Sequence, residues 1–313
     1  MQKLYYTGHC NPSAAVALDK EHFIVADDED NQLRIYAKTS PSQPLQTLAL
    51  ADIFSGDIED GEDLEIDLEG AAEIDGTYFW IGSHSTSRKG QERPARQRLL
   101  ALTLTVGDQG QFIAHPAGQI VTTLLAALAA DARFKPYHFK QARSIQSKSI
   151  GGLNIEGLSA TPAKSLLIGF RNPLQGGKIK QDRLINGKAL VIELLNPFAV
   201  IKGQAALFAD PIELDLQGLS IRDICWRKNQ KYLIVAGPYH DNLPNKKQPR
   251  EKTQLYSWST KSGKLKQLKQ IDLEDLNIET AIFYPGQPDS VQLLSDDGQL
   301  EYSQGFRSVT VDL

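Results

Sequence analysis

The sequence is poor in cysteine and in long hydrophobic runs, and both absences exclude classes of protein. Two cysteines, Cys10 and Cys225, cannot form a disulfide framework in a chain of 313 residues, so we expect a cytoplasmic protein with reduced thiols. No apolar run approaches the roughly 18 residues that a membrane-spanning helix needs, so we expect no membrane partner. The first residues, MQKLYYTGHCNPS, lack the basic and apolar stretches of a secretory signal, and we expect no signal peptide.

An excess of basic residues is absent as well. The formal net charge is −4, whereas a nucleic-acid-binding domain usually carries a basic excess, so we expect no nucleic-acid partner. The chain also lacks a P-loop, a serine nucleophile elbow and a paired-cysteine metal motif. The familiar sequence signatures of nucleotide hydrolases, serine hydrolases and zinc sites are therefore missing.

What the sequence does contain is a repeated pair of strands. Each copy has an apolar or alternating run, a turn and a second apolar run, and most copies are followed by two more strand-like segments. Four strands per repeat are typical of a β-propeller blade. We therefore predict an all-β fold in which residues 1–313 form a single β-propeller domain with four-stranded antiparallel blades. The five copies begin at Asn11, Asp67, Asn154, Ser220 and Asn277.

Five copies predict five blades, and two segments bear on how the ring is completed. The longest interval, between Asp67 and Asn154, contains TTLLAALAADARF, which predicts one short helix in an insertion between blades; a degenerate sixth blade there is the alternative. The N-terminal segment KLYYTG is expected to add a strand to the last blade and close the ring. A β-sandwich would explain the alternating pattern but not the Glu-Gly pair that opens two of the copies.

The third residue of each copy is expected at the mouth of the central channel, where the first strand of each blade begins. Ser13, Glu69, Glu156, Arg222 and Glu279 occupy this position. Three carboxylates converging on one place repel one another, and a divalent cation would relieve the repulsion. We therefore expect Ca²⁺, or another divalent cation, as a cofactor. Its candidate ligands are Glu69, Glu156, Glu279 and Asp223.

Glycine follows two of these carboxylates, and polar residues follow the second strand of each copy. Gly70 and Gly157 are expected to allow a tight turn or the close approach of a ligand, and to leave the carboxylates uncrowded. The residues after the second strand are expected on the same face as the mouth. They are Asp27, Asp28, His84, Ser85, Arg171, Asn172, Tyr239, His240, Asp296 and Asp297.

Two long loops on this face are basic. Residues 83–98 and residues 171–188 each carry five basic residues against one acidic residue. They predict a small anionic ligand, because arginine grips phosphate and carboxylate groups in a forked geometry. The alternative is that the loops pair with the nine carboxylates of residues 52–70, in which case Arg88 or Arg93 approaches segment 57–67. The candidate substrate-binding residues are Arg88, Arg93, Arg171, Asn172 and Arg222.

His84 is the best candidate for a general acid or base. It follows the second strand of its copy, on the side of the channel mouth. A structural hydrogen-bonding role is the alternative for this histidine. Glu69 and Glu156 complete the candidate catalytic set.

Several segments, taken in order, resemble a mostly bacterial propeller family known as domain of unknown function 3616. They are ADDEDNQLRIY, DLEGAA, WIGSHS, RPARQRL, NIEGLS, IGFRNPL, GKALVIEL, IRDI and AGPYHD. The resemblance implies a β-propeller fold and names no activity. More distantly, the Glu-Gly strand start is similar to phytase-like esterase propellers, in which carboxylates at the mouth hold metal and a basic rim holds phosphate.

Two functions follow from these resemblances and from the charges. The first is a calcium-dependent, phosphoesterase-like hydrolase of an anionic substrate, in which the metal polarises phosphoryl oxygens and arginines neutralise developing charge. The alternative is a non-catalytic propeller that binds a partner or a small anionic ligand on the same face. The fold by itself does not choose between them.

Overall fold

The computed structural model describes residues 3–9, 11–40, 43–58, 64–180, 183–240, 252–273, 275–298 and 304–313. Blade 1 contains β2 (Pro12–Ala17), β3 (His22–Asp27), β4 (Gln32–Ala37) and β5 (Gln46–Ala49), and blade 2 contains β6 (Leu68–Ile74), β7 (Thr77–Gly82), β8 (Leu99–Val106) and β9 (Phe112–Pro116). Blade 3 contains β10 (Asn154–Ala160), β11 (Leu166–Asn172), β14 (Ala189–Leu194) and β15 (Ile212–Leu214). Blade 4 contains β16 (Ser220–Lys228), β17 (Lys231–Gly237), β18 (Gln254–Ser259) and β19 (Leu265–Gln267). Blade 5 contains β20 (Ile278–Phe283), β21 (Ser290–Ser295), β22 (Gly305–Asp312) and β1 (Lys3–Thr7).

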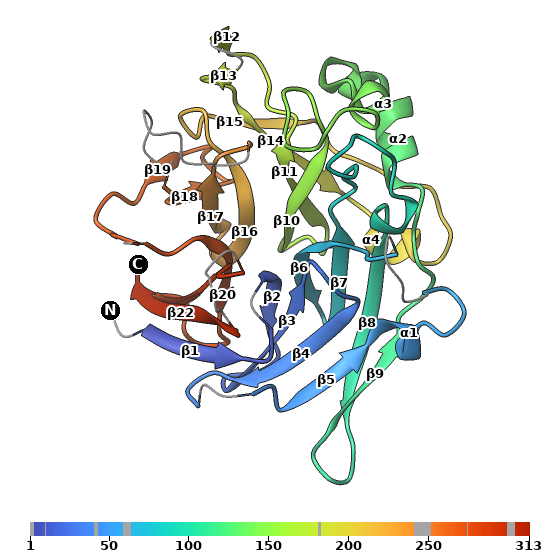
Figure 1. Ribbon diagram of the computed structural model, residues 1–313, viewed down its shortest axis with the longest axis vertical. Coiled ribbons are helices and arrows are strands. Elements are labelled where there is room, and N and C mark those ends of the chain that lie inside the picture. Colours follow the sequence, from blue (N-terminus) through green and yellow to red (C-terminus); the bar gives the residue numbers. More distant parts are fainter. Residues whose placement is uncertain are drawn as a thin grey trace.

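These five antiparallel sheets surround a common centre, and β2, β6, β10, β16 and β20 lie innermost (Figure 1). The predicted five-bladed β-propeller is therefore confirmed. The N-terminal strand β1 pairs with β22, from Lys3 opposite Val309 to Thr7 opposite Gly305, as the sequence predicted. This pairing completes blade 5 with a strand from the opposite end of the chain and so closes the ring.

The insertion between blades 2 and 3 is helical and contains no sixth blade in its described residues. It holds α2 (Leu124–Ala130), the 3₁₀ helix η2 (Ala132–Tyr137) and α3 (Phe139–Ala142). Other short elements lie in loops: α1 (Leu50–Ile53), the 3₁₀ helix η1 (Pro94–Arg96), α4 (Pro197–Val200), and a small hairpin of β12 (Lys178–Lys180) and β13 (Arg183–Ile185). This hairpin projects at the periphery of the molecule (Figure 1).

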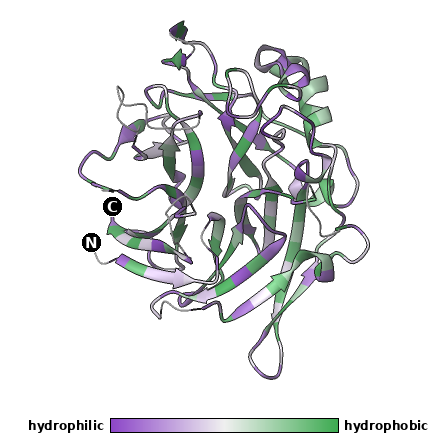
Figure 2. Ribbon diagram, in the orientation of Figure 1, coloured by the Kyte–Doolittle hydropathy of each residue, from purple (hydrophilic) through white to green (hydrophobic). Residues whose placement is uncertain are grey.

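The hydrophobic core lies between the blades. Among the described residues, five buried clusters each join two neighbouring blades around the ring. Both faces of a blade are therefore covered, which explains why β7, with the sequence TYFWIG, is apolar along its length and buried at every residue. Figure 2 shows hydrophobic stretches on the strands of every blade and on α2.

Each innermost strand is irregular at the same point of the repeat. In every blade the pairing of the first two strands shifts register at the third residue of the copy, which is the mark of a β-bulge, and blades 3 and 4 each have a second shift. A bulge redirects the side chain of the extra residue, so it explains how a strand that is otherwise buried can present a polar group at the centre. The residues at the shift are Ser13, Glu69, Glu156, Arg222 and Glu279.

The glycines after Glu69 and Glu156 serve the packing of one blade on the next, which differs from the expected role in a turn or at a ligand. A Cβ atom on Gly70 would lie 2.8 Å from the Leu158 Cβ atom and 3.0 Å from the Leu158 backbone nitrogen, both in the inner strand of blade 3. A Cβ atom on Gly157 would lie 3.1 Å from side-chain atoms of Ile221 and Ile224 in blade 4. Glycine is required because neighbouring inner strands approach closely.

Gly70→Ala is therefore expected to lower the free energy of unfolding by about 1–3 kcal/mol, because the obstacle includes backbone that cannot move aside. Gly157→Ala is the matched comparison and should cost less, since its nearest neighbours are isoleucine side chains at 3.1 Å. Urea denaturation of both variants measures the difference. Equal stability of Gly70→Ala and the wild type would contradict this explanation.

The environment of the cysteines and the lengths of the helices bear on the expectations drawn from composition. Cys225 is packed between blades 4 and 5, and burial raises the pKa of its thiol; Cys10 lies outside the described residues. Within the part of the chain that the structure describes, no helix has the length and apolar character needed to cross a membrane.

Candidate functional site

Buried charges from three blades meet where the innermost strands converge. Arg222 donates to Glu156 Oε2 at 3.0 Å and to Glu279 Oε2 at 2.9 Å, and Arg171 donates to Glu156 Oε1 at 2.8 Å. Glu156 is only 2% exposed. Burial alone would raise its pKa, but the two guanidinium groups hold the pKa of Glu156 below its usual value. Glu156 therefore stays ionised, and the expected meeting of Glu156, Arg222 and Glu279 is confirmed.

In blades 3 and 5, the residue two positions before the glutamate is an asparagine, and its side chain donates a hydrogen bond to the glutamate carboxylate. Asn154 Nδ2 donates to Glu156 Oε1 at 2.6 Å, and Asn277 Nδ2 donates to Glu279 Oε1 at 3.0 Å. In blade 2 the corresponding residue is Asp67. When ionised, the Asp67 carboxylate has no proton to donate to Glu69. The hydrogen bond found in blades 3 and 5 is therefore replaced in blade 2 by a second negative charge.

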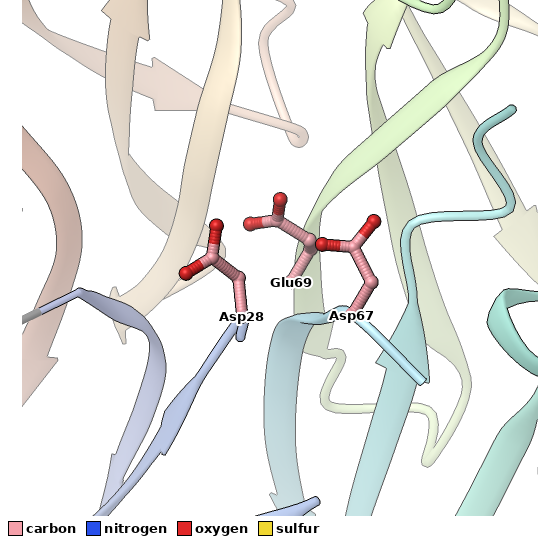
Figure 3. A group of neighbouring side chains, drawn as sticks. All are labelled: Asp28, Asp67 and Glu69. Atoms are coloured by element: carbon pink, nitrogen blue, oxygen red, sulfur yellow. The ribbon is translucent and has the colours of Figure 1, made fainter. Parts of the chain in front are cut away.

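Blade 2 accordingly contributes to a group of three carboxylates. One oxygen each from Asp28, Asp67 and Glu69 lies within 4.8 Å of the other two, and Figure 3 shows the three side chains gathered between blades 1 and 2. Asp28 Oδ1 is buried and accepts no hydrogen bond. Among the described residues, none donates a hydrogen bond to Glu69 or forms an ion pair with it.

The electrostatics of this group favour a cation. Burial, followed by the neighbouring carboxylates, raises the pKa of Asp28 and of Glu69 well above their usual values. Burial also raises the pKa of Asp67, although Arg96 and Ser83 oppose the change. An all-oxygen, anionic donor set suits a hard divalent cation such as Ca²⁺, and the absence of thiolate and imidazole from these three ligands disfavours zinc.

Asp67 is oriented by its surroundings in the way a metal ligand usually is. Its Oδ2 atom accepts hydrogen bonds from Ser83 and from Ser85, the latter at 3.2 Å, and pairs with Arg96 at 2.9 Å. Every described contact of this carboxylate ends on Oδ2, so Oδ1 is left for a ligand. Partners of this kind fix the direction of a coordinating group and tune its charge.

Arg96 of loop 83–98 reaches the described part of the acidic segment. It pairs with Glu65 as well as with Asp67. Pairing between these two segments was expected, with Arg88 or Arg93 as the basic partner. Arg88 is exposed, and its carbonyl accepts a hydrogen bond from Gln146. Arg96 is the last residue of η1, and its two partners lie just before β6.

The other predicted substrate-binding residues are engaged with the protein itself. Besides its bond to Glu156, Arg171 donates to the carbonyls of Tyr239 at 3.1 Å and His240 at 3.4 Å. Asn172 donates to the carbonyls of Ser147 at 2.7 Å and Ser149 at 3.1 Å. These bonds tie loops together around the mouth, and the binding roles of Arg171, Asn172 and Arg222 stay predictions.

The remaining metal-ligand candidates are also held by the protein. Asp223 accepts hydrogen bonds from the Ile224 nitrogen, the Thr280 hydroxyl and the Ala281 nitrogen, at 2.7, 3.1 and 2.8 Å, and these tie β16 to β20. Burial raises the pKa of Asp223 to about 7. The metal-ligand roles of Glu156, Glu279 and Asp223 stay predictions, whereas Glu69 lies with Asp28 and Asp67.

Asp28 and Asp67 were not among the predicted ligands. Asp28 was placed on the mouth face from its position after β3, but its neighbour across the blade interface was not visible in the sequence. Asp67 carried a usable signal, because it stands where copies one, three and five have asparagine.

His84 has one ring nitrogen, Nε2, that is buried and without a described partner, so this nitrogen could bind a ligand or accept a proton. Its Nδ1 atom lies 2.9 Å from the Gly82 carbonyl oxygen, which can only accept, so Nδ1 carries the proton. Burial lowers the pKa of His84 to about 4, and the ring is neutral at pH 7. The Nε2 lone pair is buried and without a hydrogen-bond donor, although His84 is not one of the three clustered residues.

The raised pKa of Glu279 predicts an unusual pH dependence of the free energy of unfolding. Burial raises its pKa from 4.5 to about 7, although Arg222 opposes the change. The folded protein therefore keeps a proton that the unfolded chain releases as the pH passes 4.5, and this contribution to stability is lost as the pH rises to about 7. We expect the free energy of unfolding to fall by about 2 kcal/mol between pH 5 and 8 in a chelating buffer.

Glu279→Gln, which cannot titrate, is the control for this loss. Its stability should change less between the two pH values than that of the wild type. Urea denaturation at each pH provides the measurement. A wild type that becomes more stable with rising pH would refute the assignment.

Comparison with known proteins places the chain in a family. No curated protein matches it. The chain is similar to the solved structure of glutaminyl cyclase from Myxococcus xanthus, at 10% identity over 100% of this chain and 96% of that chain, with a TM-score of 0.47. It is also similar to MPT-4, a mannose phosphorylase from Leishmania mexicana in complex with phosphate, at 9% identity over 100% and 88% of the two chains, with a TM-score of 0.46. The profile of the family described as "Protein of unknown function (DUF3616)" matches residues 11–114 and 108–245, and this chain belongs to that family.

Proposed function

We propose that this protein binds a divalent cation, best fitted by Ca²⁺, through Asp28, Asp67 and Glu69, and that it hydrolyses a small phosphate ester held at this cation. The observation that carries the proposal is the group of three facing carboxylates in which Asp28 Oδ1 is buried and without a partner. Burying uncompensated carboxylates costs free energy, and a bound cation removes that cost.

The charges and the ligand count favour an anionic substrate. Ca²⁺ takes about six to eight oxygen ligands, so three carboxylates leave positions open for water and for a substrate oxygen. A divalent cation balances two of the three carboxylates, and Arg96, which is shared with Glu65, offsets part of the third, so most of the negative charge that would repel an added anion is removed. A bound cation would supply Lewis-acid chemistry, polarising a phosphoryl oxygen and favouring ionisation of water.

The chain's own residues have definable tasks in this proposal. Ser83, Ser85 and Arg96 hold Asp67 so that its free oxygen faces the cluster. The neutral His84, with its Nε2 lone pair unused, is the candidate proton acceptor on the same face.

Non-catalytic binding of a small anion is the second candidate, and one observation favours it. The guanidinium groups of Arg96, Arg171 and Arg222 all donate to protein acceptors already, so they are less free to stabilise charge that develops in a reaction. Binding by the cation alone requires none of them.

One experiment separates these possibilities. Phosphate release from aryl phosphates and from phytate is measured with Ca²⁺ and with a chelator, beside calorimetric titration of Ca²⁺ and of inorganic phosphate. Hydrolysis that requires Ca²⁺ and is lost in Asp28→Asn supports the enzyme, while calcium-dependent phosphate binding without turnover supports the second candidate. Glu73→Gln, an exposed carboxylate on the same strand as Glu69, is the control and should behave as the wild type. The absence of Ca²⁺ binding at millimolar concentration would overturn both.

A further inference from the structure

A second concave site lies outside the channel, beside the outer strands of blade 4. Its cavity has a volume of about 640 Å³. Three pieces of chain line it: residues 252–255 at the start of β18, residues 267–273 around and after the end of β19, and residues 275–277 before β20. A volume of this size falls in the range of about 300–1,000 Å³ that is typical of sites for small organic ligands.

About half of the wall of this cavity is apolar. Leu255, Leu268, Leu273 and Leu276 are buried hydrophobic residues that line it, and Ile271 is partly buried beside them. Thr253, Gln254 and Gln267 add polar groups without charge. Such a wall favours a ligand with a hydrocarbon body and a few hydrogen-bonding atoms.

The unpaired charge at the rim is positive. Lys252 and Lys269 line the cavity and are exposed, and among the described residues neither has an ion-pair or hydrogen-bond partner. Two carboxylates also line the cavity: Asp275 is neutralised by Arg307 at 2.6 Å and by Lys3 at 3.3 Å, and the exposed Asp272 also interacts with another group. An occupant would therefore meet two free ammonium groups beside the leucines of the wall.

A simpler explanation covers only part of this lysine-rich edge. Five lysines and no acidic residue occur from Lys252 to Lys269. Lysines on an outermost strand prevent pairing with other chains, which accounts for Lys266 in β19 and for its neighbour Lys264. It does not account for Lys252 and Lys269, which lie outside β19 and border the cavity.

We propose that this cavity binds an amphipathic organic anion, a small molecule with an alkyl or aryl body and one carboxylate, sulfonate or phosphate group. The hydrocarbon body lies against the leucines, and the anionic group lies between Lys252 and Lys269. The site is independent of the cation site at the channel mouth, and its occupancy requires no metal.

The test is calorimetric titration of the full chain with decanoate, with butyrate and with decylammonium, below the concentrations at which they form micelles. Decanoate should bind, and butyrate and decylammonium should each bind at least about tenfold more weakly, because one lacks the hydrocarbon body and the other reverses the charge. Equal binding of decanoate and decylammonium, or no binding of decanoate, would overturn the proposal.

Two double variants with the same change in net charge locate the site. Lys252→Glu with Lys269→Glu should weaken decanoate binding by about tenfold, whereas Lys261→Glu with Lys264→Glu, on the same blade but away from the cavity, should change it by less than about twofold. All four positions are exposed, so thermal unfolding should show both variants folded as the wild type. Equal losses in the two variants would mean that the basic edge attracts anions non-specifically, and the proposal would fail.

Discussion

Glu156→Gln is expected to lower the free energy of unfolding by about 3–5 kcal/mol, whether or not a divalent cation is present. The wild-type carboxylate is 2% exposed and accepts from Arg171, Arg222 and Asn154. An amide keeps the size of the side chain but removes the charge that compensates two desolvated guanidinium groups. Breaking a buried ion pair on one side costs more than the pair contributes, because the other charge stays buried.

Glu69→Gln is the matched control, since it makes the same substitution at the same position of the repeat in another blade. Glu69 has no described hydrogen-bond or ion-pair partner, and its carboxylate faces those of Asp28 and Asp67. Removing its charge should leave the cation-free protein as stable as the wild type or more stable. Urea denaturation in a chelating buffer measures both variants. Similar losses in the free energy of unfolding from the two substitutions would contradict the structure, in which Glu156 is paired with arginines and Glu69 is not.

Ca²⁺ is expected to stabilise the wild type by about 2.7 kcal/mol at a free concentration one hundred times its dissociation constant, because a ligand that binds only the folded state shifts unfolding by mass action. Glu69→Gln and Asp28→Asn should lose most of this increment, since each removes one anionic ligand. Glu156→Gln should retain it, although this variant starts from a lower stability. The three variants thus separate the cation site from the guanidinium network.

Thermal unfolding across a titration of Ca²⁺ provides the measurement, with Glu73→Gln as a variant that changes net charge equally. A flat wild-type response up to millimolar Ca²⁺ would remove the cation site and the proposed hydrolase with it. A calcium response that vanishes in Glu156→Gln and persists in Glu69→Gln would place the ion at Glu156, away from the group of Asp28, Asp67 and Glu69.

The repeat in the sequence was sufficient to determine the blades. A hairpin is a local structure, so its apolar runs and turn can be recognised wherever they recur along the chain. The recurrence predicted five blades, the strand from KLYYTG in the last blade, and the meeting of Glu156, Arg222 and Glu279 at one channel. Each of these depends on order along the chain, which the sequence displays directly.

The tertiary structure alone decided which carboxylates are compensated. Arg222 is separated from Glu156 by 66 residues and from Glu279 by 57, yet it neutralises these two, while Glu69 faces Asp28 and Asp67. The same holds for Gly70, whose need for a missing Cβ comes from Leu158 in the next blade. These outcomes depend on distances of a few ångströms across the interfaces between blades, and a repeat pattern specifies the existence of those interfaces but not the atoms that meet there.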